Sequence, residues 1–203
     1  MKVSIINTNT GNIQSLKNMF NKIGIETTIC FKKNELEASD ILVLPGVGSF
    51  DAAINYLKKQ GTYELLSDKN FFKKKYLIGI CLGMQILLER SEEGNEKGLC
   101  LIPGKVIKFE KNIIKVPHMG WNILNKCKES FSTLENMKFY FAHSYFAECK
   151  EEYVQATCVH DQEFPAIIRS EKIIGIQFHP EKSHKNGIFL LKNLFDKISS
   201  NAL

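Results

Sequence analysis

Hydrophobic positions in the first half of the chain alternate between strand-like and helix-like spacing. A continuous β-branched run at residues 2–7 predicts a strand that is buried on both faces. An amphipathic helix is predicted next, closed by Gly24, from apolar residues at helical spacing: Ile13, Leu16, Phe20 and Ile23. Strand-length runs follow at residues 25–31 and 41–44. This alternation predicts an α/β fold with a parallel sheet and crossover helices.

The predicted secondary structure changes near Gly98 from alternating helices and strands to mainly short strands. Before it, we expect helices at 51–59 and 63–75, and then a buried strand at 77–82 with a helix directly after it. Beyond it, short segments rich in β-formers predict a smaller antiparallel region: 105–109, 121–124, 139–142, 153–159, 166–169 and 173–178. A helix at about 187–198 ends the chain. We therefore predict a single domain over residues 1–203, with a central, mostly parallel sheet flanked by helices.

Composition narrows the class of protein. Apolar residues make up 44% of the chain and charged residues 24%, and the longest apolar runs are too short to cross a bilayer. The N-terminus lacks a signal-peptide profile, so we expect a cytoplasmic protein without a membrane partner. The net charge of +5 is spread over scattered lysines, which disfavours nucleic-acid binding but leaves open a phosphorylated substrate or an acidic partner. The six cysteines lack a C-x-x-C pair, so we expect reduced thiols and no metal site.

Candidate chemistry begins at Cys81, which stands between Gly79 and Gly83 at the end of a predicted strand. Gly-x-Cys-x-Gly is the strand–elbow–helix pattern that exposes a nucleophile. We interpret the glycines as permitting a sharp turn, and the following helix as pointing its positive end at the sulfur. A core cysteine between two packing glycines is the alternative.

Two further motifs follow strand ends on the same predicted sheet edge. In the loop at 45–50, Gly46 and Gly48 would let backbone N–H groups face a ligand, as an oxyanion hole requires, although an ordinary turn explains them too. His179 and Glu181 flank a proline, and alternation along an extended segment would point both side chains the same way. Glu181 could then orient an imidazole that faces Cys81. The other histidines lack metal-ligand spacing, and we expect surface or hydrogen-bonding roles for them: His118, His143, His160 and His184.

These motifs together resemble the class I (triad) glutamine amidotransferases over essentially the whole chain. They are the Pro-Gly-Val-Gly run at 45–48, the Gly-Ile-Cys-Leu-Gly-Met-Gln run at 79–85 and the His-Pro-Glu run at 179–181. The Pro-His-Met-Gly-Trp-Asn run at 117–122 and the run at 177–183 are most similar to glutaminase subunits of imidazole glycerol phosphate synthases. A turn that packs the only tryptophan into the core is the alternative explanation of the first of these two runs.

The resemblance implies a class I amidotransferase fold and a reaction without a cofactor. L-glutamine would be hydrolysed through a thioester, and the ammonia channelled to a cyclase subunit with a (β/α)₈ barrel. That heterodimer would make imidazole glycerol phosphate and the purine-pathway intermediate AICAR in histidine biosynthesis. The resemblance also implies that the partner's ligand switches on the glutaminase, so the isolated chain is expected to have an unformed oxyanion loop.

Residue roles follow from the same resemblance. It implies a catalytic triad of Cys81, His179 and Glu181, and an oxyanion hole from the backbone of Gly46, Val47, Gly48 and Leu82. Gln85 and Glu93 would hold the α-amino-acid end of glutamine, in a pocket that is also lined by the backbone of His143, Ser144 and Tyr145. The partner interface would include Asn12, Trp121 and Lys182.

One departure keeps a close alternative open. The first loop in this family commonly reads Asp-Tyr-Gly-x-Gly-Asn, whereas residues 7–12 read Asn-Thr-Asn-Thr-Gly-Asn and keep only the last two. A paralogue that supplies ammonia for an amidino sugar of surface polysaccharide or flagellin would share the triad. The Glu at 181 and the run at 117–122 argue against a γ-glutamyl hydrolase or peptidase-like enzyme. The complete triad argues against a non-catalytic regulatory subunit.

Overall fold

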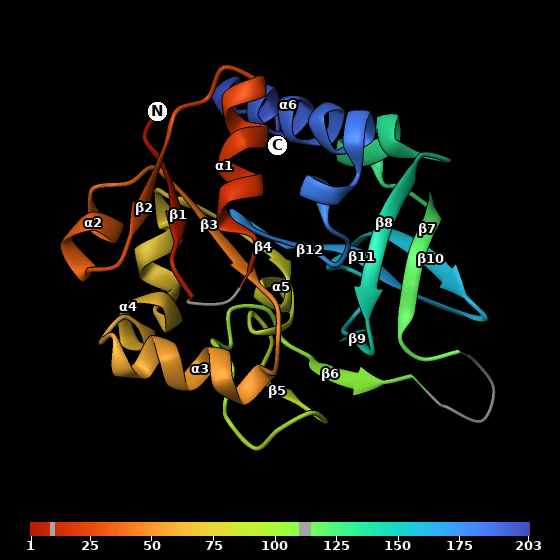
Figure 1. Ribbon diagram of the computed structural model, residues 1–203, viewed down its shortest axis with the longest axis horizontal. Helices are drawn as coiled ribbons and strands as arrows, with labels where there is room; N and C mark the ends of the chain where they lie inside the picture. Colours follow the sequence, from red (N-terminus) through yellow and green to blue (C-terminus); the bar gives the residue numbers. More distant parts are fainter. Residues whose placement is uncertain (9–10, 110–114) are drawn as a thin grey trace.

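The computed structural model describes residues 1–8, 11–109 and 115–203. Figure 1 shows a twisted sheet that runs through the molecule with helices on both sides. Within the described residues, nine strands form this sheet in the order β2-β1-β3-β4-β12-β11-β10-β7-β8. The predicted α/β class is therefore confirmed.

The first half of this sheet is parallel, as the alternating pattern predicts. Its neighbouring pairs β2–β1, β1–β3, β3–β4 and β4–β12 all run in the same direction. The inner strands are buried on both faces, which explains their continuous apolar runs. The bounds are β1 (Val3–Ile6), β2 (Thr27–Cys30), β3 (Ile41–Gly46), β4 (Tyr76–Cys81) and β12 (Ile173–Ile176).

The antiparallel region is larger than predicted and continues the same sheet. From β12 onward each neighbouring pair of strands runs antiparallel. These strands are β7 (His118–Asn125), β8 (Lys138–His143), β10 (Val154–His160) and β11 (Gln162–Ser170). A smaller sheet joins β5 (Arg90–Ser91), β6 (Lys105–Lys108) and β9 (Tyr145–Glu148). β9 follows β8 directly, so the 143–145 corner links the two sheets.

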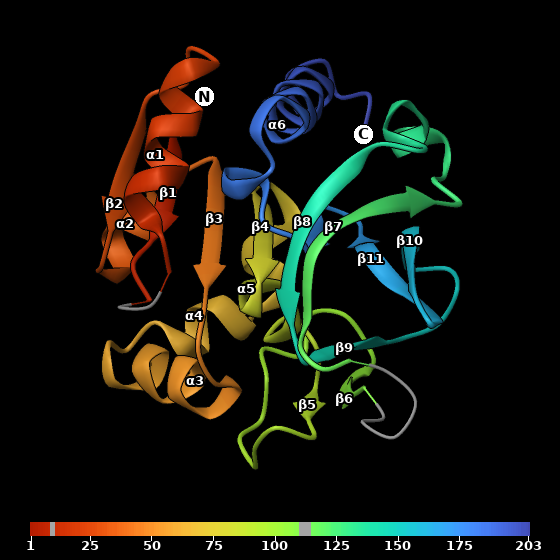
Figure 2. The ribbon, with the colours of Figure 1, turned by 45° about the vertical axis from the view of Figure 1, so that its right-hand side comes forward.

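Helices cover the two faces of the sheet and create two cores. One core joins α1 and α6 to β1, β3 and β4, and the other packs α3 and α4 against the opposite face. Figure 2 shows α1 and α6 toward the top and α3 and α4 below. The bounds are α1 (Ile13–Lys22), α2 (Lys33–Glu37), α3 (Phe50–Lys59), α4 (Tyr63–Ser67), α5 (Leu82–Gln85) and α6 (His184–Ser199), with 3₁₀ turns η1 (Lys69–Lys73), η2 (Glu129–Leu134) and η3 (Pro180–Lys182).

Two predicted helices differ from the structure. The helix expected at 63–75 divides into α4 and η1 at Asp68, whose carboxylate accepts the N–H of Asn70 and so begins a new turn. The helix expected after Cys81 ends at Gln85. Beyond it, the carbonyls of residues 86–88 accept hydrogen bonds from the N–H groups of residues 99–102, and these long-range bonds replace further helical ones. Tertiary contacts therefore override the local periodicity.

Candidate active site

Cys81 forms a strained elbow at the carboxyl end of β4. Its φ is +54° and its ψ is −111°, in a region that L residues rarely occupy. Cys81 is the last residue of β4 and lies opposite Gly46, the last residue of β3, in the parallel register. The sheet therefore holds the backbone of Cys81 in place. The side chain is only 6% exposed, yet it lines a cavity. The arrangement is that of a nucleophile elbow.

The two glycines beside Cys81 are needed for close packing, which corrects our interpretation that they permit the turn. Neither has a positive φ; the cysteine itself takes that conformation. A Cβ on Gly79 would lie 2.5 Å from the carbonyl oxygen of Gly83, and a Cβ on Gly83 would lie 1.7 Å from that of Leu44. The glycines therefore let α5 sit directly against β3 and β4.

The helix after Cys81 is also shorter than its predicted electrostatic role requires. α5 has four residues, so it has at most a small macrodipole to direct at the sulfur. The charged partner of Cys81 comes instead from a distant part of the chain.

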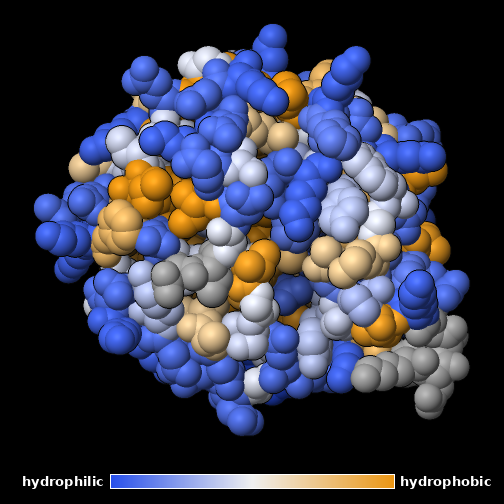
Figure 3. All heavy atoms as spheres, viewed as in Figure 1, coloured by the Kyte–Doolittle hydropathy of each residue, from blue (hydrophilic) through white to orange (hydrophobic). Residues whose placement is uncertain are grey.

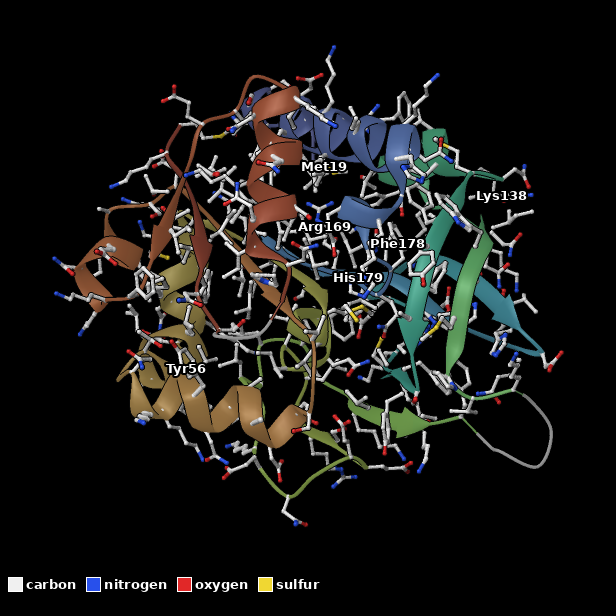
Figure 4. The ribbon with its side chains drawn as sticks, in the orientation of Figure 1. Met19, Tyr56, Lys138, Arg169, Phe178 and His179 are labelled. Atoms are coloured by element: carbon white, nitrogen blue, oxygen red, sulfur yellow. The ribbon has the colours of Figure 1, made fainter. Side chains whose placement is uncertain are left out.

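His179 and Glu181 form a buried ion pair next to Cys81. The Nδ1 of His179 lies 2.8 Å from Oε1 of Glu181, and both side chains are under 5% exposed. Figure 4 labels His179 between β12 and α6, beside β8; its backbone N–H donates to the carbonyl of Tyr140 on that strand. The pairing arises because Pro180 begins the η3 turn, which replaces the extended segment that we predicted. The second oxygen of Glu181 has no hydrogen-bond partner among the described residues.

The pKa of His179 shows how strongly this pair is coupled to Cys81. Burial alone would lower it, but interactions of the imidazole with the sulfur of Cys81 and with Glu181 raise the pKa to about 10. An imidazole with this pKa remains protonated near neutral pH. It can therefore act as a proton donor to a leaving group at that pH.

The predicted substrate residues surround one small cavity of about 210 Å³. This volume is below the roughly 300–1,000 Å³ of drug-sized ligand sites, and suits a single small metabolite. The sequence-predicted residues that line it are Val47, Gly48, Cys81, Leu82, Gln85, Glu93, His143, Ser144 and Tyr145. Pro117, Met119 and Ala142 complete the lining and escaped prediction, because contacts between β7, β8 and the elbow are long-range.

The loop proposed for the oxyanion hole faces solvent on one side and the cavity on the other. Val47 is exposed and Gly48 has a φ of +100°, with open space where a Cβ would stand. Gly46 does not line the cavity; it packs against Leu82, with only 3.0 Å between an added Cβ and the Leu82 Cβ. Glu93 holds the C-terminal end of the loop, because its Oε2 accepts a hydrogen bond from the N–H of Phe50 at 2.7 Å.

A buried amide pair, missed in part by the sequence analysis, lies between the cavity and Cys81. Gln85 Nε2 donates to the carbonyl of Tyr145 at 2.9 Å and to Oε1 of Gln177 at 3.2 Å. Gln177 Nε2 in turn donates to the Cys81 sulfur at 3.8 Å. The sequence could have indicated Gln177. It stands two residues before His179, and side chains two residues apart in an extended segment point to the same face.

Two of the three predicted interface residues, Trp121 and Lys182, contact the same side chain, Tyr140. Trp121 is 47% exposed and stacks on His184 with ring centroids 5.4 Å apart, so the alternative of a core tryptophan is wrong. Lys182 Nζ lies over the ring of Tyr140, which also contacts Trp121 edge-on. Asn12 caps α1 by accepting the N–H of Ser15, and α1 contacts η3. Figure 3 shows hydrophobic side chains scattered nearer the middle of this view and a mostly hydrophilic margin.

Clusters of metal-ligating side chains and long apolar helices are both absent from the described residues. None of their His, Cys, Asp and Glu side chains gather into a group of three or more that could hold a metal ion. None of the helices in this part of the chain is both long enough and apolar enough to cross a membrane.

Comparison with known proteins places this geometry in context. The family model for class-I glutamine amidotransferases matches residues 4–198. The chain is 42% identical over 196 residues to the imidazole glycerol phosphate synthase subunit HisH 2 of Methanococcus maripaludis, covering 94% of this chain and 97% of that protein. It is 41% identical over 196 residues to subunit HisH 1 of Campylobacter jejuni, with 94% and 98% covered. A crystal structure of a glutamine amidotransferase superposes with a TM-score of 0.75 at 19% identity, covering 95% of this chain and 97% of that one, which supports the fold.

Proposed function

Since the chain belongs to the class-I glutamine amidotransferase family, we propose that it is the glutaminase subunit of an imidazole glycerol phosphate synthase. The observation that carries this proposal is the buried His179–Glu181 pair beside a strained Cys81 that lines an amino-acid-sized cavity. The relatives named as HisH subunits support the histidine-pathway assignment.

Catalysis begins at Cys81, which attacks the side-chain amide carbon of L-glutamine. The raised pKa of His179 means that its imidazole already carries the proton before attack. His179 then delivers this proton to the departing ammonia, which leaves a γ-glutamyl thioester on the sulfur. Glu181 holds the ring through Nδ1, so that Nε2 is free for this transfer. In the second half-reaction, neutral His179 takes a proton from water, and the hydroxide equivalent releases glutamate.

Backbone groups stabilise the charge that develops on the substrate oxygen. We assign this role to the backbone N–H groups of Leu82 and of the 46–48 loop. Val47, Gly48 and Leu82 line the cavity. Gly46 does not line it but packs against Leu82. Leu82 is the first residue of α5, where helical N–H groups lack intrahelical acceptors. Loss of one such donor raises a barrier by about 3 kcal/mol.

The opposite side of the cavity binds the amino-acid end of glutamine. The free oxygen of the Glu93 carboxylate suits the α-ammonium group, because its other oxygen is held by Phe50. Gln85 contributes from α5, and the backbone at 143–145 closes the wall.

Ammonia passes to a cyclase subunit with a (β/α)₈ barrel, which makes imidazole glycerol phosphate and AICAR. We assign the contact surface to Trp121, Lys182 and Asn12. Trp121 is exposed, and Asn12 caps α1, which contacts the η3 turn that contains Lys182. On this proposal residues 1–203 act as one glutaminase domain, a cytoplasmic heterodimer forms, and neither cofactor nor metal is required.

Copurification with the cyclase tests this proposal. The Cys81→Ala variant should lose glutamine-dependent synthesis by at least about 1,000-fold. It should retain synthesis from added ammonium, because the cyclase reaction does not use the thiol. The matched control Cys127→Ala removes a half-buried thiol that does not line the cavity, and it should keep both activities. Glutamine-dependent synthesis that survives in Cys81→Ala would refute the nucleophile.

A second candidate rests on the first loop, where residues 7–12 keep only the final Gly-Asn of the family pattern. A paralogous subunit that feeds an amidino-sugar pathway would have the same glutaminase and a different partner. Complementation of a histidine auxotroph that lacks this subunit separates the two. Growth supports the histidine pathway, and failure to grow despite active glutaminase supports the paralogue.

A further inference from the structure

Two histidines outside the triad are buried and paired. His118 on β7 and His143 on β8 stand directly opposite each other in the antiparallel register, and both are under 7% exposed. Nδ1 of His118 lies 3.0 Å from Nε2 of His143. Burial lowers the pKa of His118 to about 4 and that of His143 to about 3, so both rings are neutral near pH 7.

The hydrogen bonds around this pair can run in only one direction. Asn122 fixes the start: its Oδ1 accepts the N–H of Ile123 and its Nδ2 donates to the carbonyl of Val159. Its Nδ2 also lies 3.3 Å from Nε2 of His118, which must therefore accept. A neutral His118 then carries its proton on Nδ1 and donates to His143. By the same argument, His143 carries its proton on Nδ1 and donates to the carbonyl of Tyr145 at 2.8 Å.

The chain of hydrogen bonds continues to the nucleophile. The carbonyl of Tyr145 also accepts from Gln85 Nε2, which contacts Gln177. Gln177 is fully buried, and its Nε2 donates to the sulfur of Cys81. The Tyr145 carbonyl thus accepts from both sides, from His143 and from Gln85, and this shared acceptor connects a partly exposed residue of β7 with the thiol.

We propose that His118 and His143 are positioning residues that hold the Tyr145 carbonyl and, through it, the Gln85–Gln177 pair that donates to Cys81. The assignment of Cys81 as the nucleophile rests on the function proposed above. The role of these hydrogen bonds is to keep the Gln177 N–H directed at the sulfur as a donor.

Alkylation of Cys81 by iodoacetamide measures this effect without glutamine. The rate is followed at the Cys81 peptide by mass spectrometry between pH 5 and 9, because five other cysteines are present. His118→Phe keeps an aromatic ring against Phe141, which stacks on His118, and removes both hydrogen bonds. We expect its rate profile to move to higher pH by about half a unit to one unit, because the Gln177 amide is then held less firmly as a donor to the sulfur.

Two further variants distinguish an effect of the hydrogen bonds from an effect of side-chain packing. His118→Gln can still accept from Asn122 and donate to His143, so its profile should stay near that of the wild type. His160→Phe is the matched control. His160 stacks on His118 with centroids 4.1 Å apart, but its Nε2 donates to the carbonyl of Lys115, which is not one of the groups that link His118 to Cys81. An unshifted profile in His118→Phe, or equal shifts in all three variants, would overturn the proposal.

A second variant covers the case in which His118→Phe fails to fold. Gln177→Met removes the terminal donor at similar volume and should shift the profile in the same direction. No shift there would also overturn the proposal. The two proposals fail separately. Glutaminase activity that survives in Cys81→Ala would refute the proposed function. The alkylation profile would still show whether His118 and Gln177 affect the Cys81 thiol.

Discussion

At the scale of single residues, the chemistry depends on the charge that Glu181 presents to His179. Glu181→Gln keeps an oxygen that can accept from Nδ1 but removes the negative charge. The pKa of His179 should then fall from about 10 toward its ordinary value of 6.5, which an NMR titration of the imidazole measures. Glutaminase activity should fall about 100-fold or more. Glu163→Gln, at an exposed pair with Lys126, is the matched control and should change neither quantity.

The sequence indicates some of these residues and conceals others for a physical reason. Cys81 and His179 follow strand ends, which a local pattern reveals. Gln177 is accessible to the same logic through alternation. His118 is not, because its partner lies 25 residues away and meets it only through the β7–β8 register. No single-sequence pattern specifies that register.

At the scale of elements, the active site depends on the close approach of α5 to β3. Gly83→Ala would place a Cβ 1.7 Å from the Leu44 carbonyl oxygen, so backbone must move. We expect a loss of at least about 3 kcal/mol in the free energy of unfolding, measured by urea denaturation. Gly61→Ala, where φ is +67° in open space, should lose only about 1 kcal/mol. Equal losses in the two variants would contradict the packing argument.

Predictability also varies among elements. The parallel strands are well predicted because burial on both faces produces continuous apolar runs. The helices near the site are predicted less well, since long-range hydrogen bonds to residues 99–102 end α5 after one turn. The extent of the antiparallel half was underestimated because short amphipathic strands do not reveal which sheet they join.

At the scale of the whole molecule, the buried histidines predict acid sensitivity. The pKa of His118 is about 4 when folded and 6.5 when unfolded, so below pH 6.5 the unfolded chain binds more protons. Its contribution to stability is therefore complete above pH 6.5 and is lost as the pH falls toward 4. In this window the free energy of unfolding of the wild type should fall faster than that of His118→Gln, by about 1 kcal/mol per pH unit. Parallel curves would contradict a neutral, buried His118.

The proposed assembly with a cyclase gives another expectation. Val47 and Gly48 are exposed to solvent, and a Cβ added at Gly48 would meet no atom within 4 Å. We expect the isolated chain to hydrolyse glutamine at least 10-fold more slowly than the complex with the cyclase and its ligand, because the oxyanion donors are ordered on assembly. Steady-state glutamate release measures both rates, and equal rates would show that the loop is already formed.

In the proposed reaction a single cysteine, Cys81, carries the glutamyl group. The most direct measurement is acid quenching of the complex during turnover of L-glutamine, followed by peptide mass spectrometry. If Cys81 is the nucleophile, one γ-glutamyl adduct should form on the peptide that contains it. The adduct should be absent in Cys81→Ala and sensitive to hydroxylamine, as a thioester is. Sustained glutamate release with the adduct on another residue would contradict this assignment.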